Sequence, residues 1–205
     1  MLLTLTPCDH ATAKFAVENW HYSRSMPEAG RAARRFSVHE GDRFVGAVVY
    51  GCGGINLAQQ YGLKNTECLE LVRVALDRHD TPTSRIVAVS VRLLRRSLPG
   101  LRLLASYADS GQGHHGGIYQ AGGWTYVGPG KHRQFVKVDG TVIHPRTAYG
   151  LWGTSSVPGL RAMGHDVEAV SMPPKHKYLL PLTEDMRVMC ERLRRPYPKK
   201  HASVV

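Results

Sequence analysis

The stretch TECLELVRVALDRHDTPTSRIVAVSVRLL, residues 66–94, decides the fold because a strand and a helix follow each other closely in it. Residues 66–76 carry apolar side chains on both faces of an alternating pattern. Successive side chains of a strand point to opposite faces, so a strand that is apolar on both faces lies inside a covered sheet. After Pro82, apolar residues recur at helical spacing, which predicts a helix that opens at Thr83 or Ser84 and ends near Leu98.

Two charged residues interrupt the apolar strand. Alternation places Glu70 on the face of Cys68, Val72 and Val74, and Arg73 on the other face, so we expect no direct pairing of Glu70 with Arg73. A carboxylate on an apolar face either finds another ion partner or has a raised pKa, which is how a general base near neutrality is made. Both interpretations of Glu70 stay open.

The rest of the chain alternates strands and helices. Residues 9–20 predict a helix capped by Asp9, and residues 36–51 a hairpin around the turn Gly41–Asp42. We expect further strands at 101–109, 124–128 and 133–144, the last closing the sheet, a short helix within 114–123, and a basic helix at 184–194. This pattern predicts an α/β (α+β) fold with a mixed sheet. We expect a core at 1–145, and an extension at 146–205 that packs on or completes it and ends in a basic tail.

Composition favours a soluble protein with a polyanionic partner. The net charge is +11 over 205 residues, and such an excess favours nucleic acid, because each Lys or Arg on a phosphate releases counterions. A basic surface that only maintains solubility is the alternative. No stretch is apolar enough to span a bilayer, and the start lacks the pattern of a signal peptide. We therefore expect a cytoplasmic protein without a membrane partner.

A second stretch, YADSGQGHHGGIYQAGGW at residues 107–124, combines many glycines with two histidines and an aspartate. Asp109 and Ser110 follow a predicted strand, and ligands gather outside the carboxyl ends of strands in open sheets. The glycines would let the backbone approach a ligand closely. The alternative is that Asp109 only caps the next helix.

The order of strand, helix, strand and short helix resembles the GNAT acetyltransferase superfamily, through residues 69–94 and the segment IYQAGGW at 118–124. The resemblance implies a GNAT-like, largely antiparallel sheet and a donor such as acetyl-CoA or a related small molecule. It implies donor-binding roles for Val72, Arg73, Val74, Ser84, Arg85 and His114, and Tyr119 as the acid that protonates a leaving thiolate. Tyr119 as core filling is the alternative. The superfamily's glycine-rich pyrophosphate loop is replaced by DRHDTPTSR at 77–85.

The chain also resembles the Mom family of phage DNA-modification proteins, through WHYSRSMP (20–27), ECLELVRVAL (67–76), SYADSGQGHHGGIYQAGGW (106–124) and KHKYLLPL (175–182). The resemblance implies conversion of adenine in duplex DNA to a carbamoylmethyl adduct that protects phage DNA from host restriction. It matches the family's site to His21, Tyr22 and Ser23, to Asp109 and Ser110, and to Tyr119. His21 would carry a proton, and Tyr22 would contact an extruded adenine.

Three further expectations follow. Basic loops would hold the DNA phosphates, through Arg24, Arg31, Arg34, Arg35, Lys175, His176 and Lys177. Asp109 with two of His21, His114 and His115 would allow a two-histidine, one-carboxylate iron site. Two rival functions stay open, an acetyl-CoA-dependent N-acetyltransferase of a protein or small-molecule amine, and a non-catalytic DNA-binding protein on the same scaffold.

Overall fold

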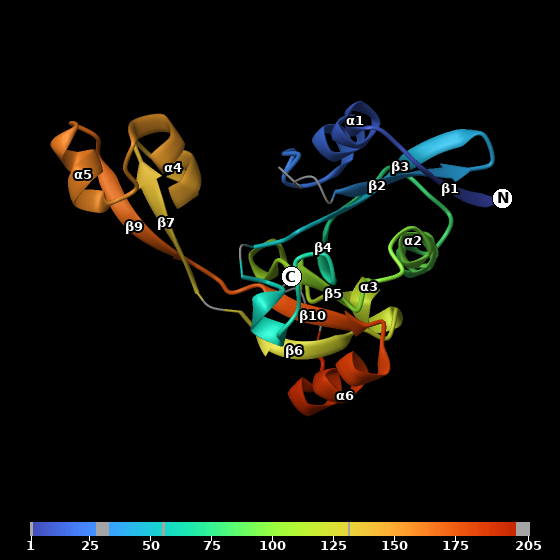
Figure 1. Ribbon diagram of the computed structural model, residues 1–205. Coiled ribbons are helices and arrows are strands. Elements are labelled where there is room, and N and C mark those ends of the chain that lie inside the picture. Colours follow the sequence, from blue (N-terminus) through green and yellow to red (C-terminus); the bar gives the residue numbers. More distant parts are fainter. Residues whose placement is uncertain (1, 28–32, 55, 131, 200–205) are drawn as a thin grey trace.

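The computed structural model describes residues 2–27, 33–54, 56–130 and 132–199. These residues form a seven-stranded sheet with the order β1-β2-β3-β4-β5-β10-β6 and a three-stranded sheet with the order β8-β7-β9 (Figure 1). The large sheet comprises β1 (Leu3–Pro7), β2 (Arg34–Glu40), β3 (Arg43–Gly51), β4 (Cys68–Leu76), β5 (Leu103–Ala108), β6 (Thr125–Pro129) and β10 (His176–Pro181). Its helices are α1 (His10–Trp20), α2 (Thr83–Ser97), α3 (Gly117–Ala121) and α6 (Glu184–Leu193), with 3₁₀ turns η1 (Gln59–Tyr61) and η2 (Ser110–Gln112). The predicted α/β class with a largely antiparallel sheet is confirmed.

Strand β4 lies in the middle of the large sheet, as its two apolar faces predict. It pairs antiparallel with β3 and parallel with β5, and the other described pairings of this sheet are antiparallel. Leu69 and Leu71 of β4 belong to the apolar cluster that contains α2, whereas Val72 and Ala75 pack with α1. The two faces of β4 are therefore covered by different helices.

A β-bulge in β4 changes the predicted alternation. Val49 of β3 pairs with Arg73 and Tyr50 pairs with Leu71, so Val72 is the extra residue. An extra residue shifts the side chains that follow it to the other face. The prediction that Glu70 and Arg73 lie on opposite faces was wrong, because both side chains border the cavity described below.

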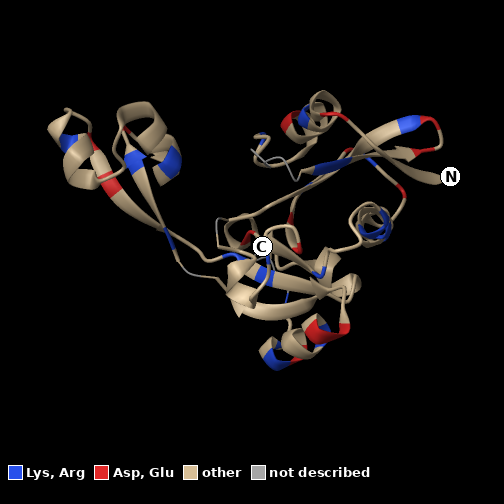
Figure 2. Cartoon of the chain, viewed as in Figure 1, with Lys and Arg blue, Asp and Glu red and all other residues tan. Residues whose placement is uncertain are grey.

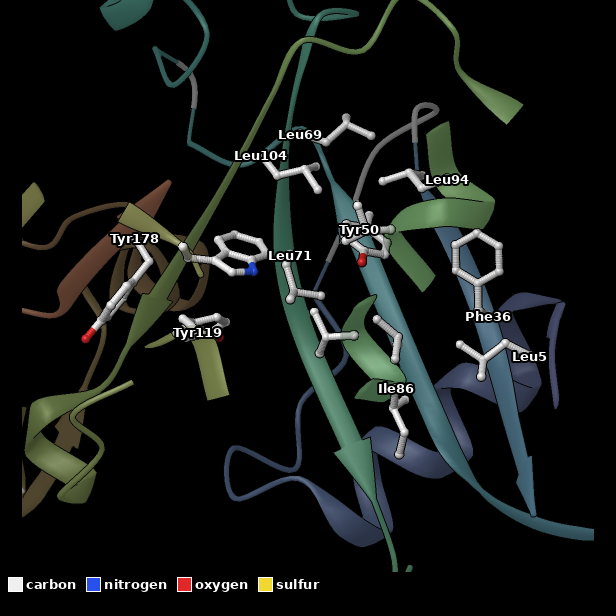
Figure 3. Close-up of a cluster of buried hydrophobic side chains, with 14 of the residues drawn as sticks. Leu5, Phe36, Tyr50, Leu69, Leu71, Ile86, Leu94, Leu104, Tyr119 and Tyr178 are labelled. Carbon is white, nitrogen blue, oxygen red and sulfur yellow. The ribbon is translucent and has the colours of Figure 1, made fainter. Parts of the chain in front are cut away.

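The larger apolar core lies between the sheet and α2 (Figure 3). Ile86 and Leu94 of α2 are fully buried there, and the Tyr50 hydroxyl lies 2.7 Å from Ser90 Oγ. A buried hydroxyl needs such a partner. This packing fixes α2 on β3 and β4.

Residues 133–143, predicted to close the large sheet, instead form β7 (Arg133–Val138) and β8 (Thr141–Ile143) of the second sheet. The strand that lies between β5 and β6 is β10, whose Tyr178 and Leu179 are fully buried. An interior strand needs apolar side chains on both faces. The consecutive buried residues Tyr178 and Leu179 supply them in β10, whereas β7 carries Arg133 and Lys137 on the face opposite Val136 and Val138. The sequence order did not predict this arrangement, because β10 follows the lobe in the chain although it lies between β5 and β6.

The second sheet belongs to a lobe, residues 133–172, that stands apart from the large sheet (Figure 1). It contains α4 (Pro145–Trp152), α5 (Val157–Ala162) and β9 (Val167–Met172) besides β7 and β8. Val136, Leu160 and other residues form its own apolar cluster. The division of the chain at residue 145 stays a prediction. In the described ranges, no helix is long and apolar enough to cross a membrane.

Candidate active site

A cavity of about 760 Å³ opens where β4 and β5 separate. The two parallel strands pair from Cys68 with Leu103 to Leu71 with Ser106, and the cavity lies beyond this pairing, bordered by residues 71–74 and 107–109. The segment 20–22, the loop 113–119 and Lys175 complete its wall. Many predicted site residues meet here: His21, Tyr22, Glu70, Val72, Arg73, Val74, Asp109, His114, His115, Tyr119 and Lys175.

Glu70 is a carboxylate in the cavity wall whose pKa is raised to about 7, mainly because burial disfavours the charged form. Lys175, Arg73 and Lys177 lower the pKa by a smaller amount. Among the described residues, no Lys, Arg or His nitrogen lies within ion-pair distance of its oxygens. A carboxylate with these properties exchanges a proton near neutral pH, which suits a general base.

The segment after α1 is held by hydrogen bonds within the segment and from Arg73. The Ser23 amide donates to His21 Nδ1 at 3.1 Å, so His21 carries its proton on Nε2. Burial, followed by Arg73 and other nearby cationic groups, lowers the pKa of His21 to about 4. Arg73 donates through Nε and Nη2 to the Ser25 carbonyl, at 3.3 and 3.2 Å. A neutral His21 therefore faces the cavity, and Ser23 orients it without bordering the cavity.

Aromatic rings form one side of the cavity. The rings of His21 and Tyr22 lie 4.3 Å apart, and the Tyr22 ring meets His114 edge-on at 5.4 Å. Tyr22 is 48% exposed although it borders the cavity, so its ring is accessible to a ligand. Planar rings in this arrangement suit contact with another aromatic ring.

Asp109 connects three segments at the rim of the cavity. Its carboxylate lies 3.4 Å from Arg133 Nη2 and 3.2 Å from Lys175 Nζ, and it accepts a 3.1 Å hydrogen bond from the Gly111 amide. The neighbouring Ser110 hydroxyl donates to the Pro174 carbonyl at 2.6 Å. Asp109 thus caps η2, a 3₁₀ turn that the sequence did not predict, and not the helix predicted within 114–123. It also joins β5 to the starts of β7 and β10.

Tyr119 borders the cavity, and Ser106 Oγ is 2.8 Å from the Tyr119 hydroxyl and 2.9 Å from the Leu71 carbonyl. Ser106 has one hydroxyl proton and the Leu71 carbonyl only accepts, so Tyr119 donates to Ser106 whenever Ser106 donates to Leu71. Burial raises the pKa of Tyr119 to about 12. The hydroxyl is engaged within the protein, and the ring packs on Trp124 and Tyr178.

Glycines in the loop 113–117 serve packing as well as conformation. Gly116 has a φ of +85°, and a Cβ there would lie 2.3 Å from the Tyr178 ring. The Tyr178 hydroxyl donates to the His115 carbonyl at 2.5 Å, and Gln120 Nε2 donates to the same carbonyl at 3.2 Å. The absence of a side chain at Gly116 therefore lets the loop with His114 and His115 settle on β10.

Several predicted residues lie outside the cavity wall. Ser84 and Arg85 are in the first turn of α2, Arg34 and Arg35 begin β2, and His176 and Lys177 begin β10, so these four are strand residues and not loop residues. Lys177 Nζ lies over the Tyr61 ring at 4.9 Å, and the Tyr126 hydroxyl is 3.0 Å from His176 Nδ1. Arg24 has a φ of 43°, and Arg31 falls outside the described residues. The DNA and donor roles of these residues stay predictions.

The iron site is not supported. In residues 2–27, 33–54, 56–130 and 132–199, no group of three or more His, Cys, Asp or Glu side chains is arranged to hold a metal ion. Asp109 is instead engaged by Arg133 and Lys175. Cations beside a carboxylate compete with a metal for its oxygens, which is the physical reason for this correction.

Sequence reasoning missed three residues of the site region. Trp20 and Tyr107 border the cavity, and Arg133 reaches Asp109 from the lobe. Trp20 directly precedes His21, and Tyr107 lies two residues before Asp109. This closeness in sequence to predicted site residues is the signal that could have indicated them. For Arg133 the sequence carries no comparable signal, because its contact depends on how the lobe joins the large sheet.

Known proteins resemble this chain in sequence family and in fold. The Mom protein family profile matches residues 2–199, and no curated protein matches in sequence. A spermidine/spermine N-acetyltransferase from Vibrio cholerae superposes with a TM-score of 0.50 at 10% identity, covering 91% of this chain and 96% of the other. An acetyltransferase from Bacillus subtilis, solved with CoA, superposes with a TM-score of 0.51 at 11% identity, covering 89% and 100%. At such identities, the likeness shows the fold, which is GNAT-like.

Proposed function

Because the chain belongs to the Mom protein family and has a GNAT-like fold, we propose that it is a transferase that modifies adenine in duplex DNA. The proposed product is carbamoylmethyl adenine, which would protect phage DNA from host restriction. One observation carries the proposal: the cavity combines an accessible aromatic wall with a carboxyl group whose pKa is near 7. The adenine ring and the carboxylate that accepts its proton would thus lie in the same cavity.

The aromatic wall supports a nucleobase as the acceptor. An enzyme that acts on a base inside a duplex must extrude it into a pocket and hold it by stacking and hydrogen bonds. His21 and Tyr22 offer ring faces and edges, and a volume of about 760 Å³ lies within the range of small-molecule sites. The net charge of +11 favours the approach of a phosphate backbone.

Glu70 would act as the proton acceptor. The exocyclic nitrogen of adenine attacks the methylene carbon of the donor, a nitrogen–carbon bond forms, and the bond from that carbon to the leaving group breaks. The leaving group keeps the electron pair, and Glu70 takes the proton that the nitrogen loses. Arg73 donates to the Ser25 carbonyl and so holds the segment that contains His21 and Tyr22. Through this segment it would position the adenine.

The donor is proposed to be a small molecule. The fold favours a donor of the acetyl-CoA type, but an acetyl group joins through its carbonyl carbon and does not give a carbamoylmethyl adduct. In the loop before α2, the buried Glu40 carboxylate accepts from the amides of Asp80, at 3.0 Å, and Thr81, at 2.6 Å. Pro82 offers no amide, so this loop does not fit the diphosphate of the coenzyme.

Mass spectrometry of nucleosides tests the proposal. Plasmid DNA would be isolated from bacteria that express the protein, its Glu70→Gln variant or its Glu67→Gln variant. We expect the carbamoylmethyl adduct with the protein and with Glu67→Gln, and its loss with Glu70→Gln. Unmodified adenine with soluble protein would contradict the proposal, and an acetyl adduct on adenine or on another amine would favour the acetyltransferase instead.

A further inference from the structure

The lobe leaves one face of its sheet uncovered. Val136 and Val138 of β7 point to the side where Ala148 of α4 and Leu160 of α5 are buried. The register places the alternate residues of the three strands together on the other side. These residues are Arg133, Phe135, Lys137, Val142, Glu168, Val170 and Met172, which we call the open face; none of them is buried.

The open face is small and narrow. β7 and β9 have six residues each and β8 has three, so the two long strands form a ribbon about 20 Å long and about 10 Å wide. Its area of about 200 Å² is well below the roughly 800 Å² that each partner of a stable dimer contributes. A two-stranded ribbon of this width is of the kind that enters the major groove of B-DNA, which is about 12 Å wide.

The open face begins at the rim of the cavity. Arg133, its first residue, contacts Asp109 at 3.4 Å, and Lys175 contacts the other oxygen of Asp109 at 3.2 Å. The two connections between the lobe and the large sheet are thereby fixed beside the cavity. Lys137 lies further along β7, 3.4 Å from Glu168, and Figure 2 shows where the basic and acidic residues of the lobe lie.

We propose that the open face docks in a groove of duplex DNA beside the base that enters the cavity. The inference rests on the proposed function and names the surface that would hold its substrate. Arg133 and Lys137 would approach the phosphates, and Val142 would lie against the sugars and base edges. Asp109 would be a positioning residue that keeps the docked duplex in line with the cavity.

The test is a matched pair of valine substitutions. Val142 is 47% exposed on the open face and Val188 is 46% exposed on α6, so Val142→Asp and Val188→Asp make the same change at equal exposure. Affinity for a short duplex with one extrahelical adenine would be measured by fluorescence anisotropy over a salt series. We expect Val142→Asp to bind at least tenfold more weakly and Val188→Asp to stay within twofold. Lys137→Ala should reduce the salt slope by about one.

The outcomes separate the inference from the function on which it rests. If the protein modifies adenine but Val142→Asp and Lys137→Ala bind duplex as the unaltered protein does, the docking surface is wrong and the function stands. If the unaltered protein neither binds duplex nor modifies adenine, the proposed function fails first. If Val142→Asp turns a dimer into a monomer in sedimentation velocity and leaves DNA affinity unchanged, the open face is an interface between copies and the inference is overturned.

Discussion

Replacing Glu70 by Gln should stabilise the protein at high pH while it removes activity. Burial raises the pKa of Glu70 from 4.5 to about 7, so the folded state binds this proton more tightly than the unfolded state does. The free energy of unfolding therefore falls as the pH rises from about 4.5 to about 7, and is constant above that window. The loss amounts to about 3 kcal/mol, at about 1.4 kcal/mol for each pKa unit.

Gln has the same shape and no charge, so the variant avoids this loss. Urea unfolding, followed by tryptophan fluorescence, would be measured for both proteins at about pH 4 and about pH 8. We expect nearly equal stability at the lower pH and an advantage of about 3 kcal/mol for Glu70→Gln at the higher pH. The adduct should decrease by a factor of about 100 or more, as expected when a general base is removed.

Glu67→Gln is the control, because it should show the opposite sign. The Lys64 amide, followed by Arg102, lowers the pKa of Glu67, so its charged form stabilises the folded protein above the unfolded pKa and this contribution is lost as the pH falls. Glu67→Gln should therefore have a lower free energy of unfolding than the unaltered protein at about pH 8, and nearly the same free energy of unfolding at low pH. If the advantage of Glu70→Gln did not grow with pH, a cation would be compensating the Glu70 charge and our reasoning would be refuted.

Substitutions at Tyr22, Gly116 and Asp109 test the site further. Tyr22→Ala should reduce adduct formation tenfold or more in the nucleoside assay while Tyr22→Phe keeps most of it, because the ring face makes the contact; equal losses would point to the hydroxyl. Gly116→Ala should lower the free energy of unfolding by about 2 kcal/mol or more, because the added Cβ would meet the Tyr178 ring. Gly113 has a φ of +70° and open space around it, so Gly113→Ala should lower the free energy of unfolding by only about 1 kcal/mol. Equal losses for the two variants in urea unfolding would disprove the packing role of Gly116. Asp109→Asn should increase proteolysis at the two connections of the lobe, because it removes the charge that two cations contact; an unchanged cleavage rate would argue against a positioning role.

Local signals were sufficient for most of the large sheet. Both faces of residues 66–76 are apolar, which predicted β4 as an interior strand, and the turn Gly41–Asp42 predicted the hairpin of β2 and β3. Asp9 caps α1 through the Thr12 amide at 2.8 Å, as its position before the helix indicated. These features depend on residues close in sequence, which is why they were readable.

Features that depend on contacts between residues far apart in the sequence could not be predicted from it. The bulge at Val72 depends on how β3 pairs with β4, and alternation alone placed Glu70 and Arg73 on opposite faces. The exchange of β7 for β10 in the large sheet depends on which of two strands fits between β5 and β6. For the site, the sequence indicated His21, Tyr22 and the stretch 109–119, parts of which border the cavity, but the ion pairs of Asp109 depend on the position of the lobe.

The position of β10 has a consequence for how the protein is made. Among the described strands, β6 pairs with β10 and with no other strand, and β10 follows the whole lobe in the chain. During synthesis, one edge of β5 and both edges of β6 therefore stay unpaired until the ribosome has made the roughly fifty residues from the end of β6 to β10. Exposed strand edges of this kind favour aggregation and need for chaperones.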